Sequence, residues 1–357
     1  MKKITPIRAG LLNRIGRRRW IRSLLRRRKY IKTHLEQAGQ DAPDYYYIKA
    51  PDVVEVYDAD GKADHFNKTV KFLQAVESGF HKDNAVLDFR KTKHVSAAAL
   101  LMLYATIESC KRTTRSKILY PKKYERVKKV LHIANIDRLV QKSAISYNTL
   151  AEKEHIPVVS SRGAEYQEEI VDHIQKRIYS DKLDPELEHK YGDAVSETIN
   201  NVQMHAYTMG GSGGPWWLLC SVVGKRLYLA IYDLGVGIPK TVVERAWIND
   251  MISKVYPSIY LGNTAAERKI NISKSGVTDK ELISYSMMAD VSGTKSQKHG
   301  QGSKSIKALV ESFSDGKLLI FSGKGLYKMT GDDCKIELFD LPIPVKGTLI
   351  QWSMDLL

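Results

Sequence analysis

Apolar and polar positions between residues 47 and 140 follow two patterns in turn. Short apolar runs typical of strands alternate with longer runs whose apolar residues recur at helical spacing. The expected strands are 53–57, 85–89 and 117–120, and the expected helices are 67–79, 97–109 and 124–133. This alternation favours a small α/β domain in which helices cover a sheet.

A later helix, expected over residues 193–206, has two different faces. Glu197, Asn201 and His205 recur every fourth residue and therefore share one polar face, while apolar residues share the opposite face. An amphipathic helix on a protein surface has the same pattern. The polar face alone therefore predicts only exposure to solvent, and its chemistry depends on motifs later in the chain.

A strand expected over residues 228–232 runs directly into Asp233, which is followed by Gly235 and Gly237. An aspartate that closes a strand is a fixed hydrogen-bond acceptor at the end of a sheet, and the glycines let the chain turn away without side chains in the cavity. Such an acceptor suits an exocyclic amine. Considered alone, the two glycines are explained equally well by a turn.

A second pair of glycines, Gly300 and Gly302, opens a helix expected over residues 306–313. Glycines at a helix N-terminus leave backbone N–H groups free for an anion such as phosphate. A turn is again the simpler explanation when the pair is considered alone. The fragment that starts at Gly302 is not a Walker A loop, because no G-x4-G precedes Lys304.

Taken together and in this order, the motifs resemble the nucleotide-binding domain of the GHKL superfamily, which includes gyrase, Hsp90, histidine kinases, MutL and the anti-sigma-factor serine kinases. Residues 197–205 resemble its N box, residues 233–238 its G1 box and residues 300–302 its G2 box, and Gly347-Thr348 resembles its final G-T motif. The resemblance covers residues 164–357. It implies a Bergerat-type α/β sandwich with helices on one face of a mixed sheet.

The same resemblance implies ATP and Mg2+ as cofactors and gives three residues specific roles. Asn201 would supply a neutral amide oxygen to Mg2+, and Glu197 would polarise the attacking water or hydroxyl as the general base. Asp233 would accept a hydrogen bond from the adenine amine. The remaining nucleotide contacts are assigned to His205, Gly235, Gly237, Lys295, Lys298, Gly300, Gly302, Lys304 and Thr348.

One departure from the family pattern bears on the reaction. After Gly302 the family usually has Leu-Gly-Leu, whereas this chain has Ser303-Lys304-Ser305, which places a charge where the helix normally packs. We therefore expect nucleotide binding rather than efficient turnover.

The stretch between the G1 and G2 boxes, at about residues 240–299, is longer than common connections between elements. We expect it to form a lid over bound triphosphate. A helix is expected over residues 280–289, followed by a flexible segment over residues 291–298 that is rich in Ser, Gly and Lys.

The first domain, expected over residues 43–145, resembles the STAS family of anti-sigma-factor-antagonist-like domains. The resemblance rests on residues 84–137, where a strand that ends in Asp88-Phe89 is followed by a small-residue turn and an apolar helix. It implies a protein partner for this domain. Ala97 stands where antagonist members carry a phosphorylatable serine, so a phosphoswitch is not expected; Ser96 is either a helix N-cap or, with a one-residue shift, the phosphate acceptor.

The net charge of +16 is concentrated at the start of the chain, because +12 of it lies within residues 1–40. Residues 1–42 therefore form a basic arm with a candidate amphipathic helix. Three interpretations of the arm stay open: contact with nucleic acid phosphates, contact with an anionic membrane surface, or packing of a short apolar stripe on the body. An Arg-rich start also suits an organellar transit peptide.

Composition sets the remaining limits. With 43% hydrophobic and 27% charged residues, the chain is not expected to be disordered or fibrous. Its three cysteines are far apart, which gives neither a zinc spacing nor a disulfide framework and favours a reduced, cytoplasmic compartment. No apolar run approaches the roughly 20 residues of a membrane span. Residues 146–163 are polar and are expected to form a linker.

These features favour an ATP-dependent conformational switch with slow Mg-dependent hydrolysis. One alternative is a protein serine kinase of the anti-sigma-factor type, in which Glu197 activates the serine of a partner. Another is a non-catalytic ATP-binding adaptor whose basic arm holds nucleic acid. A homodimer stays open, whereas a histidine kinase is disfavoured, because no pair of dimerisation helices with a phosphoacceptor histidine precedes the ATP domain.

Overall fold

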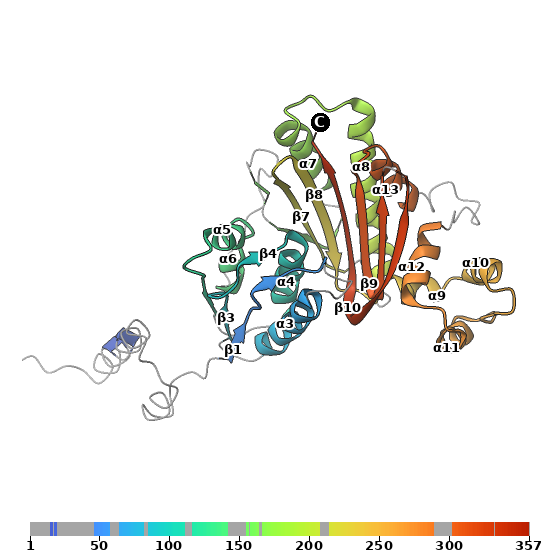
Figure 1. Cartoon of the computed structure of the whole chain (residues 1–357), viewed down its shortest axis with the longest axis horizontal. Coiled ribbons are helices and arrows are strands. Elements are labelled where there is room, and N and C mark those ends of the chain that lie inside the picture. The colour runs from blue at the N-terminus through green and yellow to red at the C-terminus, as the bar shows by residue number, and fades with distance from the viewer. Residues whose placement is uncertain are drawn as a thin grey trace, which may run out of the picture. The chain divides into compact units, whose positions relative to one another are not determined.

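Figure 1 shows the computed structural model of the chain. The structure describes residues 15–16, 18–19, 46–57, 64–81, 85–110, 116–141, 155–156, 158–163, 166–207, 214–288, 302–331 and 333–356. Contacts divide the chain into two units, Met1–Tyr45 and Tyr46–Leu357. The four described residues of the basic arm are helical, and the rest of the helix expected there lies outside the described residues.

The N-terminal half of the larger unit is an α/β assembly of short parallel strands. One sheet has the order β1-β3-β5, and β2 pairs with β4. The elements are β1 (Tyr46–Lys49), β2 (Val53–Val54), α3 (His65–Phe80), β3 (Ala85–Asp88), β4 (His94–Val95), α4 (Ala97–Ser109), β5 (Lys117–Leu119), α5 (Glu125–Ile133) and α6 (Ile136–Val140). The α/β class and all three expected helices are confirmed, while the strand expected over residues 53–57 is shorter.

Ser96 caps helix α4. Its Oγ accepts a hydrogen bond from the Ala99 backbone N–H at 3.4 Å, and the residue is 5% exposed. The N-cap interpretation of Ser96 is thus confirmed, because a serine in this position satisfies one of the free N–H groups at the start of a helix.

The C-terminal half contains a five-stranded sheet in the order β6-β7-β8-β10-β9. Its strands are β6 (Val159–Ser161), β7 (Trp216–Val223), β8 (Arg226–Asp233), β9 (Lys317–Thr330) and β10 (Ile336–Asp355). Among the described residues, every pair of neighbouring strands in this sheet runs antiparallel. The expectation of a mixed sheet was therefore wrong, and the physical reason is that β7–β8 and β9–β10 are consecutive hairpins with short connections.

Strand β6 also changes the boundary between the two halves. It lies within the stretch expected to be a linker, residues 146–163, yet it pairs with the outer end of β7. Within that stretch, residues 159–161 therefore belong to the sheet.

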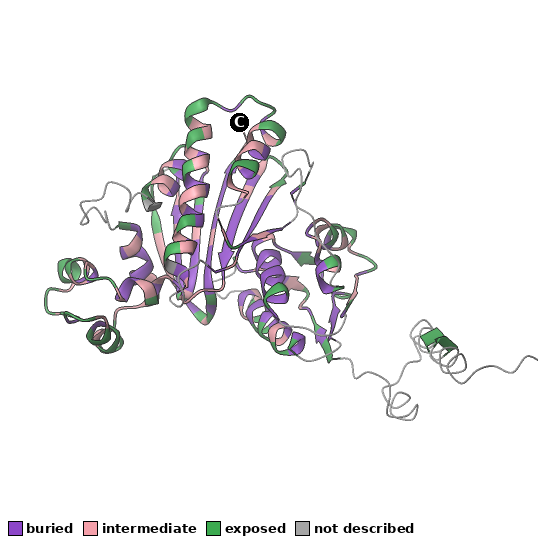
Figure 2. Cartoon of the chain, turned by 180° about the vertical axis from the view of Figure 1, so that it is seen from behind, coloured by how far each residue is buried: buried purple, intermediate pink, exposed green. Residues whose placement is uncertain are grey.

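Helices α7 (Gln167–His173), α8 (Pro185–Asn201) and α13 (Gly302–Glu311) cover one face of this sheet. Seen from behind, the long helix α8 crosses in front of the sheet, with its buried residues turned toward the strands (Figure 2). Val195, Ile199 and Val202 are all buried, so the apolar face expected for this helix is confirmed.

Residues 238–288 form four helices where a lid was expected. They are α9 (Ile238–Val243), α10 (Ile248–Val255), α11 (Ala265–Ser275) and α12 (Asp279–Met288). Their apolar residues form a small core of their own, and α12 also packs on β9. The helix expected over residues 280–289 is confirmed as α12, whereas the flexible segment expected over residues 291–298 lies outside the described residues.

The second face of the C-terminal sheet is covered by the N-terminal half. Helix α4 packs on β7 and β8, and one hydrophobic core runs from α3 and α4 into the sheet. Every residue of α4 from Ala98 to Ile107 is buried, which agrees with a sequence that is apolar on all sides. The helix lies between two sheets, so the two halves share a core instead of forming separate ones.

Polar contacts reinforce this shared core. Trp217 of β7 is 1% exposed, and its indole Nε1 donates to Glu108 Oε2 at the end of α4 over 2.6 Å. Lys346 Nζ forms an ion pair with Glu77 of α3 at 2.6 Å.

We expect Glu108→Ala to lower the free energy of unfolding by about 1 to 2 kcal/mol, because it leaves the buried indole N–H of Trp217 without an acceptor. Glu108→Gln, which keeps an acceptor oxygen, is the matched control. Denaturant unfolding followed by tryptophan fluorescence checks the prediction, because Trp216, Trp217, Trp247 and Trp352 all report on the C-terminal half. Two separate transitions would contradict the shared core.

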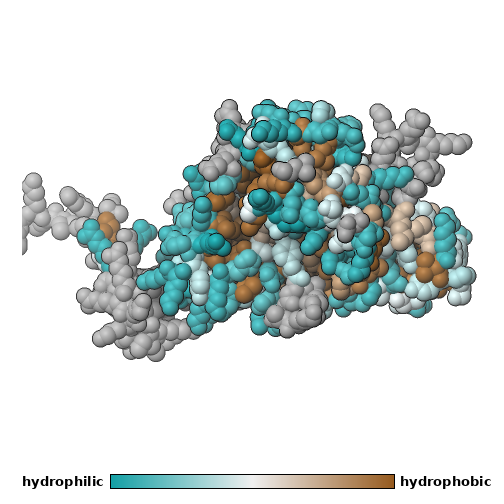
Figure 3. Space-filling model, turned by 45° about the horizontal axis from the view of Figure 1, so that its top comes forward, coloured by the Kyte–Doolittle hydropathy of each residue, from teal (hydrophilic) through white to brown (hydrophobic). Residues whose placement is uncertain are grey.

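None of the helices in the described ranges has the length and apolar character needed to cross a membrane. The face seen in Figure 3 has hydrophilic residues around its margins and hydrophobic residues gathered toward its middle.

Candidate functional site

Asp233 is the last residue of β8, and its carboxylate is buried at the end of the central sheet. The residue is 3% exposed, and its Oδ1 accepts a hydrogen bond from the Gly235 backbone N–H at 2.7 Å. Burial raises the pKa of this carboxyl group to about 7, although backbone hydrogen bonds from Gly235 and Thr348 act in the opposite direction. Because burial outweighs these hydrogen bonds, a further donor would stabilise the ionised carboxylate.

The side of the sheet that Asp233 faces is determined by strand geometry. Ile231, two residues earlier, belongs to the core beneath α8, whereas Tyr232 belongs to the core shared with the N-terminal half. Because successive side chains of a strand point to opposite faces, Asp233 lies on the same side of the sheet as α8.

Gly347 allows the backbone of β10 to approach Asp233. Thr348 pairs with Asp233 in the register of the two strands. Gly347 has φ +71°, and a Cβ atom at this position would lie 1.9 Å from the Asp233 carbonyl oxygen. Only glycine fits here without moving the strand that carries the aspartate.

The loop after Asp233 is attached to the end of the α8 helix. After Asn201 the helix continues as one π-helical turn, η3 (Val202–Ala206), and the Ala206 carbonyl oxygen accepts from the Val236 N–H at 2.8 Å. A Cβ on Gly235 would lie 2.2 Å from that same oxygen. The residue that directly follows the expected N box is therefore in contact with the expected G1 box.

Tyr207 forms a second attachment between the two segments. Its hydroxyl accepts from the Leu234 N–H at 3.0 Å and donates to the Pro215 carbonyl oxygen at 2.7 Å. Burial, together with the nearby charge of Asp233, raises the pKa of Tyr207 above its ordinary value, so the hydroxyl stays protonated and can donate. Sequence reasoning missed this residue, and the only available signal was an aromatic residue directly after a polar helix.

Ser322 of β9 connects three parts of the site. Its Oγ accepts from the Ile238 N–H at the start of α9 at 2.9 Å, and it lies 3.1 Å from both the Gly347 carbonyl oxygen and Thr348 Oγ1. The residue is fully buried. No sequence motif singled it out, because it belongs to a strand that was not expected.

Glu197 and Asn201 lie one turn apart on α8 and are both half-buried. The polar face expected for them is thus confirmed as far as Asn201. His205 differs, because it lies within the π turn, where the four-residue spacing of an α-helix no longer holds. The side chain of His205 lies outside the described residues, so its place on the same face as Glu197 and Asn201 stays a prediction.

The phosphate side of the expected site is described only in part. Helix α13 begins at Gly302 and packs along α8, with Lys304 exposed in its first turn. The expected helix over residues 306–313 thus starts earlier than predicted. Lys295, Lys298 and Gly300 lie outside the described residues.

No group of three or more His, Cys, Asp or Glu side chains in the described part of the chain could hold a metal ion. Asn201 offers a single amide oxygen. Magnesium in proteins is commonly held by one or two side-chain oxygens together with substrate phosphates and waters, so a site of this kind fits a metal that arrives with a nucleotide.

Comparison with known proteins assigns no role to these residues. No family model matches the chain, and no curated protein matches it.

Proposed function

We propose that the protein binds ATP together with Mg2+ between β8, α8 and the start of α13, and that it acts as an ATP-dependent conformational switch with slow hydrolysis. The observation that carries the proposal is the buried carboxylate of Asp233, whose loop is attached to the end of the helix that bears Glu197 and Asn201. The resemblance to the GHKL superfamily, from which these residues take their proposed roles, supports the proposal as well.

Asp233 would recognise the base. An adenine amine would donate a further hydrogen bond to the carboxylate, beside the one from the Gly235 backbone N–H, and a hydrogen bond to a charged group contributes about 1.5 to 3 kcal/mol. Guanine carries a carbonyl oxygen at the equivalent position, which would repel the carboxylate. The site should therefore prefer ATP to GTP.

Glu197 and Asn201 would act on the triphosphate side. Asn201 would contribute its amide oxygen to the magnesium ion, which neutralises charge on the phosphates. Glu197, one turn earlier, would accept the proton of the attacking water. Lys304 and the backbone N–H groups at the start of α13 would hold phosphate oxygens.

The shared core supports the proposal of a switch. Tyr232 immediately precedes Asp233, is 2% exposed, and donates from its hydroxyl to the Lys346 carbonyl oxygen at 2.7 Å. It belongs to the core that contains α4. A displacement of β8 on nucleotide binding would therefore also act on the N-terminal half, where a STAS-like domain would meet its protein partner.

We expect ATP affinity to fall as the pH decreases through about 7. The pKa of free Asp233 is raised to about 7, and a donor from the base favours the ionised form, so the bound pKa is lower. The affinity for ATP then reaches its maximum above about pH 7, and below that pH it falls by up to about tenfold per pH unit. Equilibrium binding across this range checks the prediction, and Asp233→Asn, which has no carboxyl group to titrate, should lose this dependence.

We expect Glu197→Gln to lower phosphate release by about a hundredfold or more while ATP binding changes little, because a general base contributes about 10² to 10⁴ to a rate. Asp193→Asn, on an exposed residue one turn earlier on α8, is the matched control. Equal phosphate release by wild type and Glu197→Gln would contradict hydrolysis at this site. Transfer of labelled phosphate to a partner protein would instead favour the serine kinase, and ATP binding with neither reaction would favour the adaptor.

A further inference from the structure

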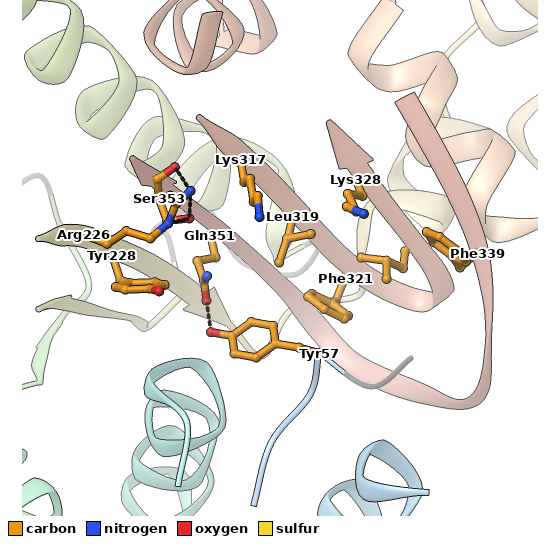
Figure 4. A pocket seen from close by; sticks show the side chains of 11 residues that line it. Tyr57, Arg226, Tyr228, Lys317, Leu319, Phe321, Lys328, Phe339, Gln351 and Ser353 are labelled. Atoms are coloured by element: carbon orange, nitrogen blue, oxygen red, sulfur yellow. Dashed lines mark hydrogen bonds between the residues drawn. The ribbon is translucent and has the colours of Figure 1, made fainter. Parts of the chain in front are cut away.

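A pocket of about 400 Å³ lies on the other face of the C-terminal sheet, the face that also carries the N-terminal half (Figure 4). Its lining comes from β8, β9 and β10 and from Tyr57, which lies after β2. Arg226 lines this pocket at the start of β8, whereas Asp233 ends the same strand. The pocket is therefore separate from the candidate nucleotide site.

The floor of the pocket is made of buried polar groups. Gln351 is 3% exposed and Ser353 is 4% exposed. The Tyr57 hydroxyl donates to Gln351 Oε1 at 2.5 Å, and Arg226 donates to Ser353 Oγ at 3.2 to 3.3 Å. A polar row that simply faced solvent would leave these side chains exposed, whereas here hydrogen bonds hold them in place beneath Tyr57.

The charged groups of the lining are all cations. Arg226, Lys317 and Lys328 line the pocket, and none of its described lining residues is acidic. Arg226 is held by Asp315 and Asp355, and Lys328 pairs with Glu337. Lys317 is exposed and has no ion-pair partner among the residues that the structure describes.

The rest of the lining is apolar and partly aromatic. Phe321 and Phe339 line the pocket together with Leu319 and Leu326. In Figure 4 the two lysines lie along one margin, with Tyr57 and Phe321 across from them. The volume is within the range of about 300 to 1,000 Å³ that is usual for small-molecule sites.

We propose that this pocket binds a small organic anion with an apolar or aromatic body. Lys317 holds the carboxylate or phosphate group of the ligand, and the body lies against Phe321 and Phe339. The proposal does not depend on ATP binding at Asp233, because the two sites share no residue.

The test uses three probes on the full chain. The first is 8-anilinonaphthalene-1-sulfonate, which has both an anionic group and an aromatic body; the second is neutral N-phenyl-1-naphthylamine; the third is inorganic phosphate. We expect saturable binding of the sulfonate, and weaker binding of the neutral probe and of phosphate. Lys317→Gln should weaken binding of the sulfonate by about tenfold, because it removes a charge-assisted hydrogen bond.

The matched control is Lys324→Gln, an exposed lysine on the same strand that does not line the pocket. It should leave sulfonate binding unchanged, and both variants should keep the ATP affinity and unfolding midpoint of the wild type. The proposal is overturned if the sulfonate binds both variants equally, or if the neutral probe binds as tightly as the sulfonate. Phosphate that binds as tightly as the sulfonate would overturn it as well, because the aromatic wall would then contribute nothing.

Discussion

Replacing Gly347 by alanine is expected to lower the free energy of unfolding by about 4 kcal/mol or more, which is at the upper end of single substitutions. Two effects combine at this position. The backbone has φ +71°, where a non-glycine residue costs roughly 1 to 2 kcal/mol. In addition, the new Cβ would lie 1.9 Å from the Asp233 carbonyl oxygen, so β8 and β10 would have to separate next to Asp233.

Gly276 separates the two effects. It has φ +76° at the end of α11, and no heavy atom lies within 4 Å of the Cβ that alanine would add. Gly276→Ala should therefore show only the backbone cost of roughly 1 to 2 kcal/mol. Denaturant midpoints of the two variants and the wild type provide the measurement, and equal losses at both positions would show that the close approach of β10 to Asp233 is not required.

Replacing Asp233 by alanine is expected to weaken ATP binding by about tenfold to a hundredfold. The substitution removes a charge-assisted hydrogen bond worth about 1.5 to 3 kcal/mol. The substitution has two opposing effects on stability: it removes the cost of burying this carboxyl, whose pKa burial raises to about 7, and it leaves the Gly235 backbone N–H without its acceptor. Calorimetric titration with Mg-ATP gives the affinity, and the unfolding midpoint shows that the fold is retained.

GTP is the matched control ligand for Asp233→Ala. Because guanine presents a carbonyl oxygen where adenine has its amine, the wild type should bind GTP weakly and the variant should bind it no worse. An ATP affinity that is the same in wild type and Asp233→Ala would exclude Asp233 as the group that recognises the base, whatever else the site binds.

The local pattern of the sequence was enough to find most helices of the N-terminal half. Helix α4 has the bounds that its apolar run indicated, residues 97 to 109. The same run has no polar face, so it gave no information on what covers each side of the helix. The contact between α4 and β7 depends on residues more than 100 positions later in the chain, and no local pattern records it.

Strands of the C-terminal sheet were harder to predict where their pattern is interrupted. Strand β9 contains Ser322, Gly323 and Gly325, which break the alternation that identifies a strand. Strand β6 has three residues within a polar stretch. Both lie at the edges of the sheet, where fewer neighbouring residues constrain the sequence.

Spacing alone drew attention to part of the candidate site. Glu197, Asn201 and Asp233 recur at regular positions or close an element, but their roles came only from the resemblance to the GHKL superfamily. Tyr207 and Ser322 were not identified, since each acts through hydrogen bonds to backbone groups that only the folded chain brings near. The π turn at Val202–Ala206 has no signature in the sequence, and it ended the regular spacing before His205.

The position of α4 between two sheets has a consequence for synthesis of the chain. Helix α4 ends at Ser109, whereas the strands that cover its second side begin at Trp216, and β10 ends at Asp355. At about 5 to 20 residues per second, the ribosome needs on the order of 10 to 50 seconds to supply the rest of that sheet. During this interval the nascent N-terminal half presents an uncovered apolar surface, and a chaperone that binds such surfaces should associate with chains stalled before β7 and release those that include β10.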